Sequence, residues 1–339
     1  MAKDLADNSE SIRGAKELAL YYRSKNIPAY FHGGPGLGKS AVAKQMAKEL
    51  KIGFKDIRLG SKIPEDLSGI PVPDLEKRMA VWLKAEFWPN KERDGDKGII
   101  IFDELSDAPK SLQSCAYQVI LDRKINDFEL GAGWWPMAAG NRREDRAAAG
   151  TLSTALANRF AHIHIHADPE AFIEWANNND IDPLVPGFIR FRPNLLYSME
   201  GADLLSFPTP RAWEQVAKCV DADPSIRFRL VRGLVGDGAA GEFEVYMKGL
   251  NLPTIEEIVA NPKKCPIPRE PSSKYALSSM LARYAKRDNF AAIVAYVQRS
   301  EFGRDFETVT ALDATKRDSS LCDTKAWIEW ANKNSDIHL

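Results

Sequence analysis

The sequence predicts an α/β protein, in which a parallel sheet is flanked by helices and followed by a mainly helical region. Two observations carry this prediction. A glycine-rich run at 33–40 lies between an apolar stretch, 29–32, that reads as a strand and a stretch of strong helix formers, 41–50. A second apolar run, 99–104, ends in two carboxylates. Its four consecutive large apolar residues are typical of a strand that a parallel sheet buries on both faces.

The glycine-rich run fits the pattern G-x-x-x-x-G-K-[ST] of a phosphate-binding loop. Its residues are Gly33, Gly34, Pro35, Gly36, Leu37, Gly38, Lys39 and Ser40, followed by Ala41. Glycines let backbone N–H groups wrap a polyphosphate, and the N-terminus of the next helix adds a partial positive charge. We therefore expect residues 33–41 to bind ATP, with Lys39 on the β- and γ-phosphates and Ser40 on Mg²⁺. The alternative is a glycine-rich turn with a chance lysine.

The two carboxylates, Asp103 and Glu104, follow the second apolar run directly. Open α/β sheets bind ligands at the carboxyl ends of their strands, which is where these side chains are expected. Asp103 is then the natural partner of Mg²⁺, directly or through water, and Glu104 is placed to orient and activate the attacking water. The alternative is a core strand that runs into an acidic turn.

The composition sets limits on the class of protein. A chain of 339 residues is long enough for two domains, and its net charge of −1 gives no global case for nucleic-acid or membrane binding. A local basic patch stays open. The four cysteines show no C-x-x-C spacing, which fits a reducing cytosol. The sequence shows no signal peptide and no apolar run of membrane-spanning length, so we expect a cytoplasmic protein.

The remaining elements alternate between helices and strands up to about residue 167. In chain order we expect a helix at 9–25, a strand at 57–59, a proline-punctuated loop at 63–74, a helix at 109–122, a hairpin at 124–135 turned at 131–133, a strand at 135–141 ending in Asn141, a helix at 151–158 and a strand at 160–166. Asn141 could hydrogen-bond the attacking water or the γ-phosphate. From residue 168 the pattern is mainly helical.

We divide the chain into three parts on this pattern. Residues 1–167 form the nucleotide-binding α/β domain, 168–250 a helical lid and 251–339 a C-terminal helical extension. The last boundary follows the glycine-rich run 236–241.

Two clusters of side chains have competing interpretations. His162, His164 and His166 alternate along the last strand, and we expect a half-buried strand face there rather than a metal site, because three rings on one strand converge poorly. Trp82, Phe87 and Trp88 beside Lys84 either pack against the sheet edge or form a pore loop that grips a client.

These motifs, in this order, resemble the AAA+ ATPases and, within them, the MoxR-type group. The resemblance covers roughly residues 9–220. The matching segments are Walker A at 33–40, Walker B at 99–104, the D-E-x-x-x-A-P run at 103–109, the sensor-1 residue Asn141, the D-R-F segment at 158–160 with Asn158 in place of the Asp, the sensor-2 segment at 207–212, and the stretch 67–74.

The resemblance supplies roles that spacing cannot. It implies that Arg159 is an arginine finger which enters the nucleotide site of a neighbouring subunit, and hence a homo-hexameric ring. It implies that Arg211 contacts the γ-phosphate in its own subunit. The alternatives are that Arg159 is a structural surface arginine, that Arg142 or Arg143 is the finger, and that Arg211 pairs with a lid carboxylate.

The function implied is hydrolysis of ATP, with Mg²⁺, to remodel or activate a protein partner in a chaperone-like way. MoxR-type ATPases commonly act with a von Willebrand factor A domain protein, so that partner class is the first expectation. The alternatives are a nucleic-acid motor or loader, which the near-zero net charge disfavours, and a scaffold that binds ATP without turnover, which the intact Glu104 disfavours.

Overall fold

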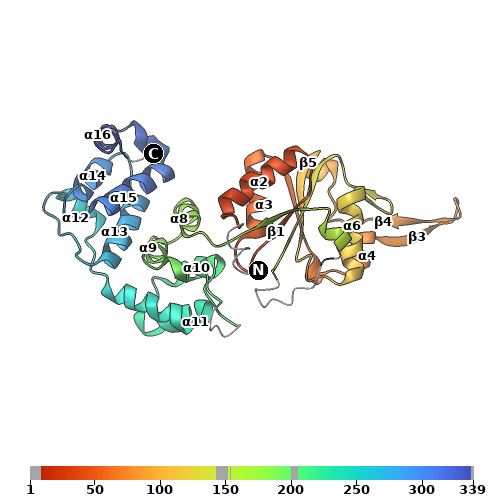
Figure 1. The fold of residues 1–339 in the computed structure, drawn as a ribbon, viewed down its shortest axis with the longest axis horizontal. Helices are drawn as coiled ribbons and strands as arrows, with labels where there is room; N and C mark the ends of the chain where they lie inside the picture. Colours follow the sequence, from red (N-terminus) through yellow and green to blue (C-terminus); the bar gives the residue numbers. More distant parts are fainter. Residues whose placement is uncertain (1–8, 143–151, 153, 200–204, 337–339) are drawn as a thin grey trace. The chain divides into compact units, whose positions relative to one another are not determined.

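The computed structural model describes residues 9–142, 152, 154–199 and 205–336. The chain forms two compact units, Met1–Ala167 and Asp168–Leu339. The first unit contains the parallel sheet and the second is helical (Figure 1). The finer division of the second unit at residue 250 stays a prediction.

The first unit is built on a five-stranded sheet with the order β2-β5-β8-β1-β9. Its strands are β1 (Ala29–His32), β2 (Gly53–Arg58), β5 (Lys97–Asp103), β8 (Gly133–Gly140) and β9 (Ala161–His164). Every neighbouring pair is parallel. The apolar runs of β5 and β8 are almost wholly buried, as expected for strands covered on both faces. The predicted α/β class with a parallel sheet is confirmed.

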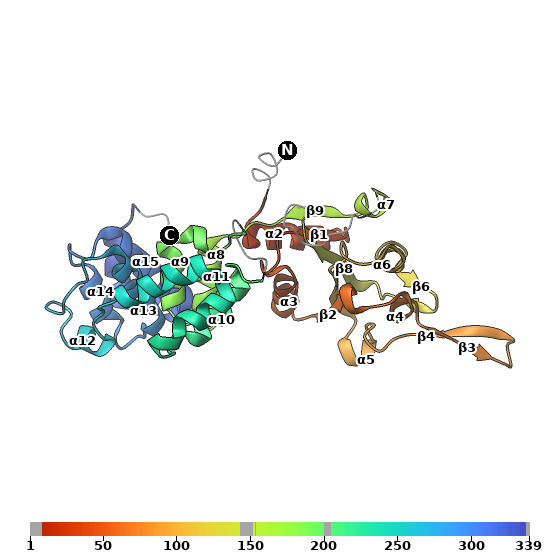
Figure 2. The ribbon, with the colours of Figure 1, turned by 90° about the horizontal axis from the view of Figure 1, so that it is seen from below.

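Helices cover both faces of this sheet, as Figures 1 and 2 show. On one face, α2 (Ile12–Ser24) and α3 (Lys39–Leu50) pack against alternate residues of β1 such as Phe31. On the other face, α4 (Pro64–Ser68) and α6 (Lys110–Asp122) pack against Tyr30 and Phe102. Ser11 caps α2 by accepting from the N–H of Gly14 at 3.2 Å. The two apolar layers hold the strand ends in a fixed order.

Two local predictions for the first unit are wrong. The stretch 63–74 is no continuous loop, because Pro64 begins α4 at a position that needs no N–H and Ile70–Asp74 forms β3, paired with β4 (Met79–Leu83). The small hairpin pairs β6 (Lys124–Ile125) with β7 (Phe128–Glu129), so its turn is at 126–127 rather than at 131–133. The two shorter helices are α5 (Lys91–Asp94) and α7 (Thr154–Ala157).

The described secondary-structure elements of the second unit are all helices. Its α-helices are α8 (Pro169–Asn178), α9 (Leu184–Phe191), α10 (Pro210–Val216), α11 (Pro224–Gly249), α12 (Ile255–Ala260), α13 (Pro271–Tyr284), α14 (Phe290–Val297), α15 (Arg304–Arg317) and α16 (Lys325–Lys333). The glycine-rich run 236–241 lies within α11, where Gly236 leaves helical geometry with φ 81° and ψ 169° and kinks the helix. Across the described ranges, no helix has the length and apolar character that crossing a bilayer requires.

Candidate functional site

The predicted nucleotide- and metal-binding residues of the first unit, with Glu104 and Asn141, gather at one edge of the sheet, where its parallel strands end, whereas Arg159 precedes β9 and lies where that strand begins. Gly33 follows β1, Asp103 ends β5 and Asn141 follows β8. The N–H of Gly33 donates to the carbonyl of Gly140 at 3.4 Å, so the loop after β1 is tied to the end of β8. This is the edge at which open α/β sheets bind their ligands.

The loop between β1 and α3 has the backbone of a phosphate cradle. Gly36 and Gly38 have φ values of 77° and 86°, in the left-handed region that glycine adopts without strain. Gly38 is the N-cap of α3 and has no side chain to satisfy the first N–H groups of the helix. Those N–H groups have no partner within the helix, so they are available to an anion.

Lys39 lies folded against this loop. Its side chain is buried, with 8% of the residue exposed. Its ammonium donates to the carbonyl oxygens of Gly33 at 2.7 Å and Gly34 at 2.9 Å, and to Oδ1 of Asn141 at 3.1 Å. The cation is therefore held over the cradle in which a triphosphate is expected.

The residues predicted to bind Mg²⁺ meet at the same edge. The Ser40 hydroxyl donates a short hydrogen bond to Oδ2 of Asp103, which brings two oxygen ligands together. A hydroxyl and a carboxylate are the donor set that Mg²⁺ accepts, so these residues fit that ion. Sequence reasoning missed Asp56 on β2. Burial, followed by the charge of Asp103, raises the pKa of its carboxyl, and a divalent cation would relieve the repulsion between the two carboxylates.

Glu104 is held in an unusual backbone conformation at the end of β5. Its φ is 59°, and its N–H donates to Oδ1 of Asp103 at 3.0 Å. Its side chain is exposed, and its carboxylate lies so close to Gly60 that a Cβ on Gly60 would collide with it. The strained turn thus directs a solvated carboxylate beside Asp103, the residue predicted to bind Mg²⁺, which suits a residue that activates water.

The arginines expected to contact the nucleotide have different surroundings. Arg159 lies in the turn after α7 with an exposed side chain, and its guanidinium has no hydrogen-bond or ion-pair partner among the described residues. Arg142 is half-buried next to Asn141, and Arg143 lies outside the described residues. Arg211 lies in the first turn of α10, in the second unit, so its contact with a nucleotide in the first unit stays a prediction.

His32, His162 and His164 form a cluster beside the phosphate-binding loop. The sequence pattern pointed to His162 and His164 but not to His32. His32 at the end of β1 shares a 2.7 Å hydrogen bond with His162, and its ring stacks on that of His164 at 4.7 Å between centroids. Burial, then His164, His162, Lys39 and Arg142, lower the pKa of His32 to about 3. In the described part of the chain, no three or more histidine, cysteine or acidic side chains come together in a group that could hold a metal ion.

The aromatic side chains after β4 divide between core and surface. Trp88 is 1% exposed and stacks on Phe128 at 4.2 Å, and the half-buried Phe87 packs against the same core. Trp82 is half-buried on β4.

The β3–β4 hairpin projects from the first unit (Figures 1 and 2) and holds an open cavity of about 430 Å³.

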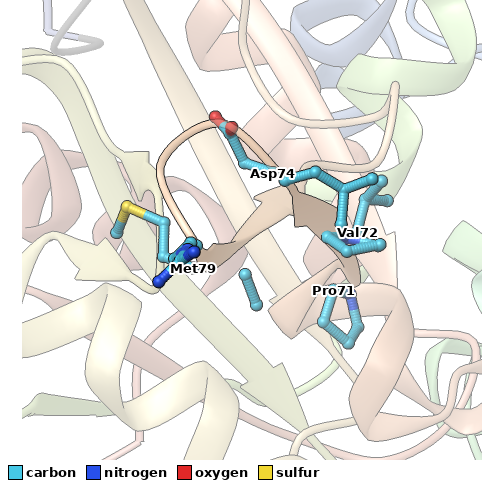
Figure 3. Close-up of a pocket in the computed structure, with 8 residues that line it drawn as sticks. Pro71, Val72, Asp74 and Met79 are labelled. Atoms are coloured by element: carbon cyan, nitrogen blue, oxygen red, sulfur yellow. The ribbon is translucent and has the colours of Figure 1, made fainter.

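That cavity is separate from the predicted site. Pro71 and Val72 on β3 and Met79 on β4 line it (Figure 3), together with Pro73, Asp74, Leu75, Arg78 and Ala80. None of the residues predicted to bind nucleotide or metal lines it.

The sheet, the loop before α3 and the two oxygen ligands define the fold of a P-loop nucleoside triphosphatase in the first unit. Residues 29–165 match the sequence model of the "ATPase family associated with various cellular activities (AAA)", so this part of the chain is similar to that family. A search among curated proteins found no match.

Two solved structures show weak likeness to the chain. One is a Cytophaga hutchinsonii protein described as a "putative ATPase", 15% identical, with a TM-score of 0.40 over 91% of this chain and 83% of that chain. The other is the Thermotoga maritima RuvB Holliday junction branch migration motor, 16% identical, with a TM-score of 0.34 over 79% and 67% of the two chains. Likenesses of this strength have no bearing on substrate or partner.

Proposed function

We propose that the chain is an ATPase of the AAA+ class that hydrolyses ATP to ADP and phosphate. The observation that carries this proposal is the convergence of four functional groups at one sheet edge. A buried ammonium from Lys39, an oxygen pair from Ser40 and Asp103, a solvated carboxylate from Glu104 and an amide from Asn141 all lie at the strand ends. Each has a role in attack of water on a γ-phosphorus.

The residues of the chain divide the work of that reaction. The N–H groups at the start of α3 bind the phosphates, and Lys39 leaves its loop carbonyls to neutralise the β- and γ-oxygens. Ser40 and Asp103 would hold Mg²⁺, which supplies further charge neutralisation on the phosphates. Glu104 accepts the proton of the attacking water, and Asn141 orients the reacting oxygen.

A ring of identical subunits completes the site. The exposed guanidinium of Arg159 has no partner among the described residues of its own subunit, which suits a side chain that serves a neighbouring subunit. A guanidinium on the developing charge of a phosphoryl transfer is worth orders of magnitude in rate. We assign this role to Arg159, and a hexamer of the MoxR type is the assembly that it implies.

The work done with ATP is the remodelling of a protein partner, for which a von Willebrand factor A domain protein is the first candidate. A net charge of −1 favours a protein client over the nucleic-acid motor that is the alternative. Stimulation of ATP hydrolysis by single- or double-stranded DNA, with no stimulation by a partner protein, would reverse this choice.

The catalytic assignment is tested by Glu104→Gln in the full chain. The amide keeps the shape of the side chain but accepts no proton, so we expect unchanged ATP affinity and a turnover lower by about 10²- to 10⁴-fold. Glu129→Gln, an exposed glutamate on β7, is the matched control and should hydrolyse ATP normally. Near-normal turnover in Glu104→Gln would assign water activation to another residue.

The assignment of Arg159 is tested by mixing two inactive variants, Lys39→Ala and Arg159→Ala. In a mixed ring, a subunit with its own Lys39 can receive Arg159 from a neighbour, so we expect turnover to recover. The control mixture of Lys39→Ala with Glu104→Gln should not recover, because both residues act within their own subunit. Mixed rings verified by mass that show no recovery would rule out Arg159 as the finger.

A further inference from the structure

Asn141 is held at both ends of its side-chain amide. Its Oδ1 accepts from the ammonium of Lys39 at 3.1 Å, and its Nδ2 donates to Oδ2 of Asp107 at 3.2 Å. Asp107 comes from the turn after β5, so this amide links Lys39 to a residue that lies 68 positions later in the chain.

The chemistry of the two neighbours fixes which way the amide points. An ammonium only donates hydrogen bonds and an ionised carboxylate only accepts them, whereas the two ends of an amide differ. A rotation of the Asn141 amide by 180° would place its N–H₂ group on the Lys39 ammonium and its oxygen on the Asp107 carboxylate. Both contacts would then be repulsive, so the observed orientation is the stable one.

Asp107 is itself fixed in place. Its Oδ1 accepts from the Ser106 hydroxyl at 3.1 Å, and its N–H donates to the carbonyl of Glu104 at 3.0 Å. The N–H of Leu105 donates to the carbonyl of Ala139 at 3.1 Å, which ties the same turn to β8, the strand that Asn141 follows. The carboxylate therefore has a defined position relative to the amide that it holds.

We propose that Asp107 is a positioning residue that sets the orientation of the Asn141 amide for ATP hydrolysis. This inference rests on the proposed ATPase function. When a triphosphate draws the Lys39 ammonium away, Asn141 loses the partner of its oxygen and stays anchored through Nδ2. The amide nitrogen of Asn141 carries two hydrogens. One is donated to Asp107, so the other is available for a hydrogen bond to the reacting oxygen. Without Asp107 the amide turns freely.

The test compares Asp107→Leu and Asp107→Asn with the wild-type chain. Leucine fills a similar space and accepts no hydrogen bond, so we expect kcat to fall by about 10- to 100-fold with the Kd for ATP within about threefold. Asparagine keeps one acceptor oxygen, so Asp107→Asn should recover much of the loss. Asp122→Leu, an exposed aspartate at the end of α6, is the matched control and should keep the wild-type kcat.

A double-mutant cycle separates positioning from general support of the fold. If Asp107 acts through Asn141, adding Asp107→Leu to Asn141→Ala should lower kcat no further. Additive losses of kcat, or a wild-type kcat in Asp107→Leu, would overturn the inference. A wild-type chain that hydrolyses no ATP would instead overturn the proposed function, so the two failures are distinguishable.

Discussion

The buried cationic side chains of the two units have different hydrogen-bond partners. In the first unit, Lys39 is held by two backbone carbonyls and one amide oxygen. In the second unit, the guanidinium of Arg227 makes two hydrogen bonds with the carboxylate of Glu244, at 3.0 and 3.1 Å, and Arg190 pairs with Asp313 at 2.8 Å. These arginines hydrogen-bond to carboxylates, whereas the three oxygens named for Lys39 belong to carbonyl and amide groups.

The difference separates a cation that serves a ligand from one that serves the fold. Hydrogen bonds to neutral oxygens are weaker than those between opposite charges, so the ammonium of Lys39 gains when a triphosphate replaces them. A buried arginine whose carboxylate is already in place has nothing to gain from a further anion. We therefore expect substitutions of the two kinds of cation to affect different measurements.

The largest effect on stability is expected from the second unit. Arg227→Ala leaves the carboxylate of Glu244 buried without its guanidinium, which costs about 3–5 kcal/mol in the free energy of unfolding. Urea unfolding of the full chain measures it, with Arg229→Ala, an exposed arginine on the same helix, as the control. The double variant Arg227→Met with Glu244→Leu should regain most of the loss. A loss below about 1 kcal/mol in Arg227→Ala would remove the contrast between the two units.

The next effect concerns binding. Lys39→Ala removes the charged donor from the phosphate cradle, so we expect the Kd for ATP to rise about 100-fold, equivalent to about 2.7 kcal/mol. Its free energy of unfolding should change less than that of Arg227→Ala. Lys48→Ala, an exposed lysine later in α3, is the control in both assays. Calorimetric titration with ATP that shows unchanged affinity would contradict the assignment of the phosphate-binding loop.

The smallest effect is a pH dependence from His32, the half-buried neighbour of that loop. Its pKa of about 3 in the folded chain lies below the ordinary 6.5, so the unfolded chain binds the extra proton between these values. Stability therefore falls as the pH is lowered from 6.5, by at most about 1.4 kcal/mol per pH unit for this group.

Urea unfolding at pH 7, 6 and 5 checks this pH dependence. His32→Gln should lose less stability on acidification than the wild-type chain, and His166→Gln, an exposed histidine, serves as the control. Equal slopes for the wild-type chain and His32→Gln would contradict it.

Local sequence patterns were sufficient for much of the fold. The strands and helices around Lys39 and Asp103 are specified by runs of apolar residues and glycines, and their boundaries agree with the structure to within a few residues. Glycine and proline were the weaker guides. Pro64 begins α4 rather than extending a loop, and of the glycines at 236–241 only Gly236 interrupts α11, where it forms a kink between two helical segments.

The sequence likewise predicted some residues of the candidate site and not others. Lys39, Ser40 and Asp103 lie together as predicted, since each follows from its place at the end of a strand or the start of a helix. The sequence patterns did not point to Asp107 or His32, because the roles of these residues depend on strand order. Local sequence patterns do not specify that order. Only the pairing of β1 with β9 brings His32 next to His164, and only the turn after β5 brings Asp107 to Asn141.

The order of strands also governs when the site can exist during synthesis. β1 leaves the ribosome early, at residues 29–32, but its two neighbours in the sheet are β8 and β9, which end at residues 140 and 164. At about 5–20 residues per second, the nascent strand waits on the order of ten seconds for its partners. A chain released before residue 133 has its phosphate-binding loop without either strand that supports it, so premature termination yields no partial nucleotide site.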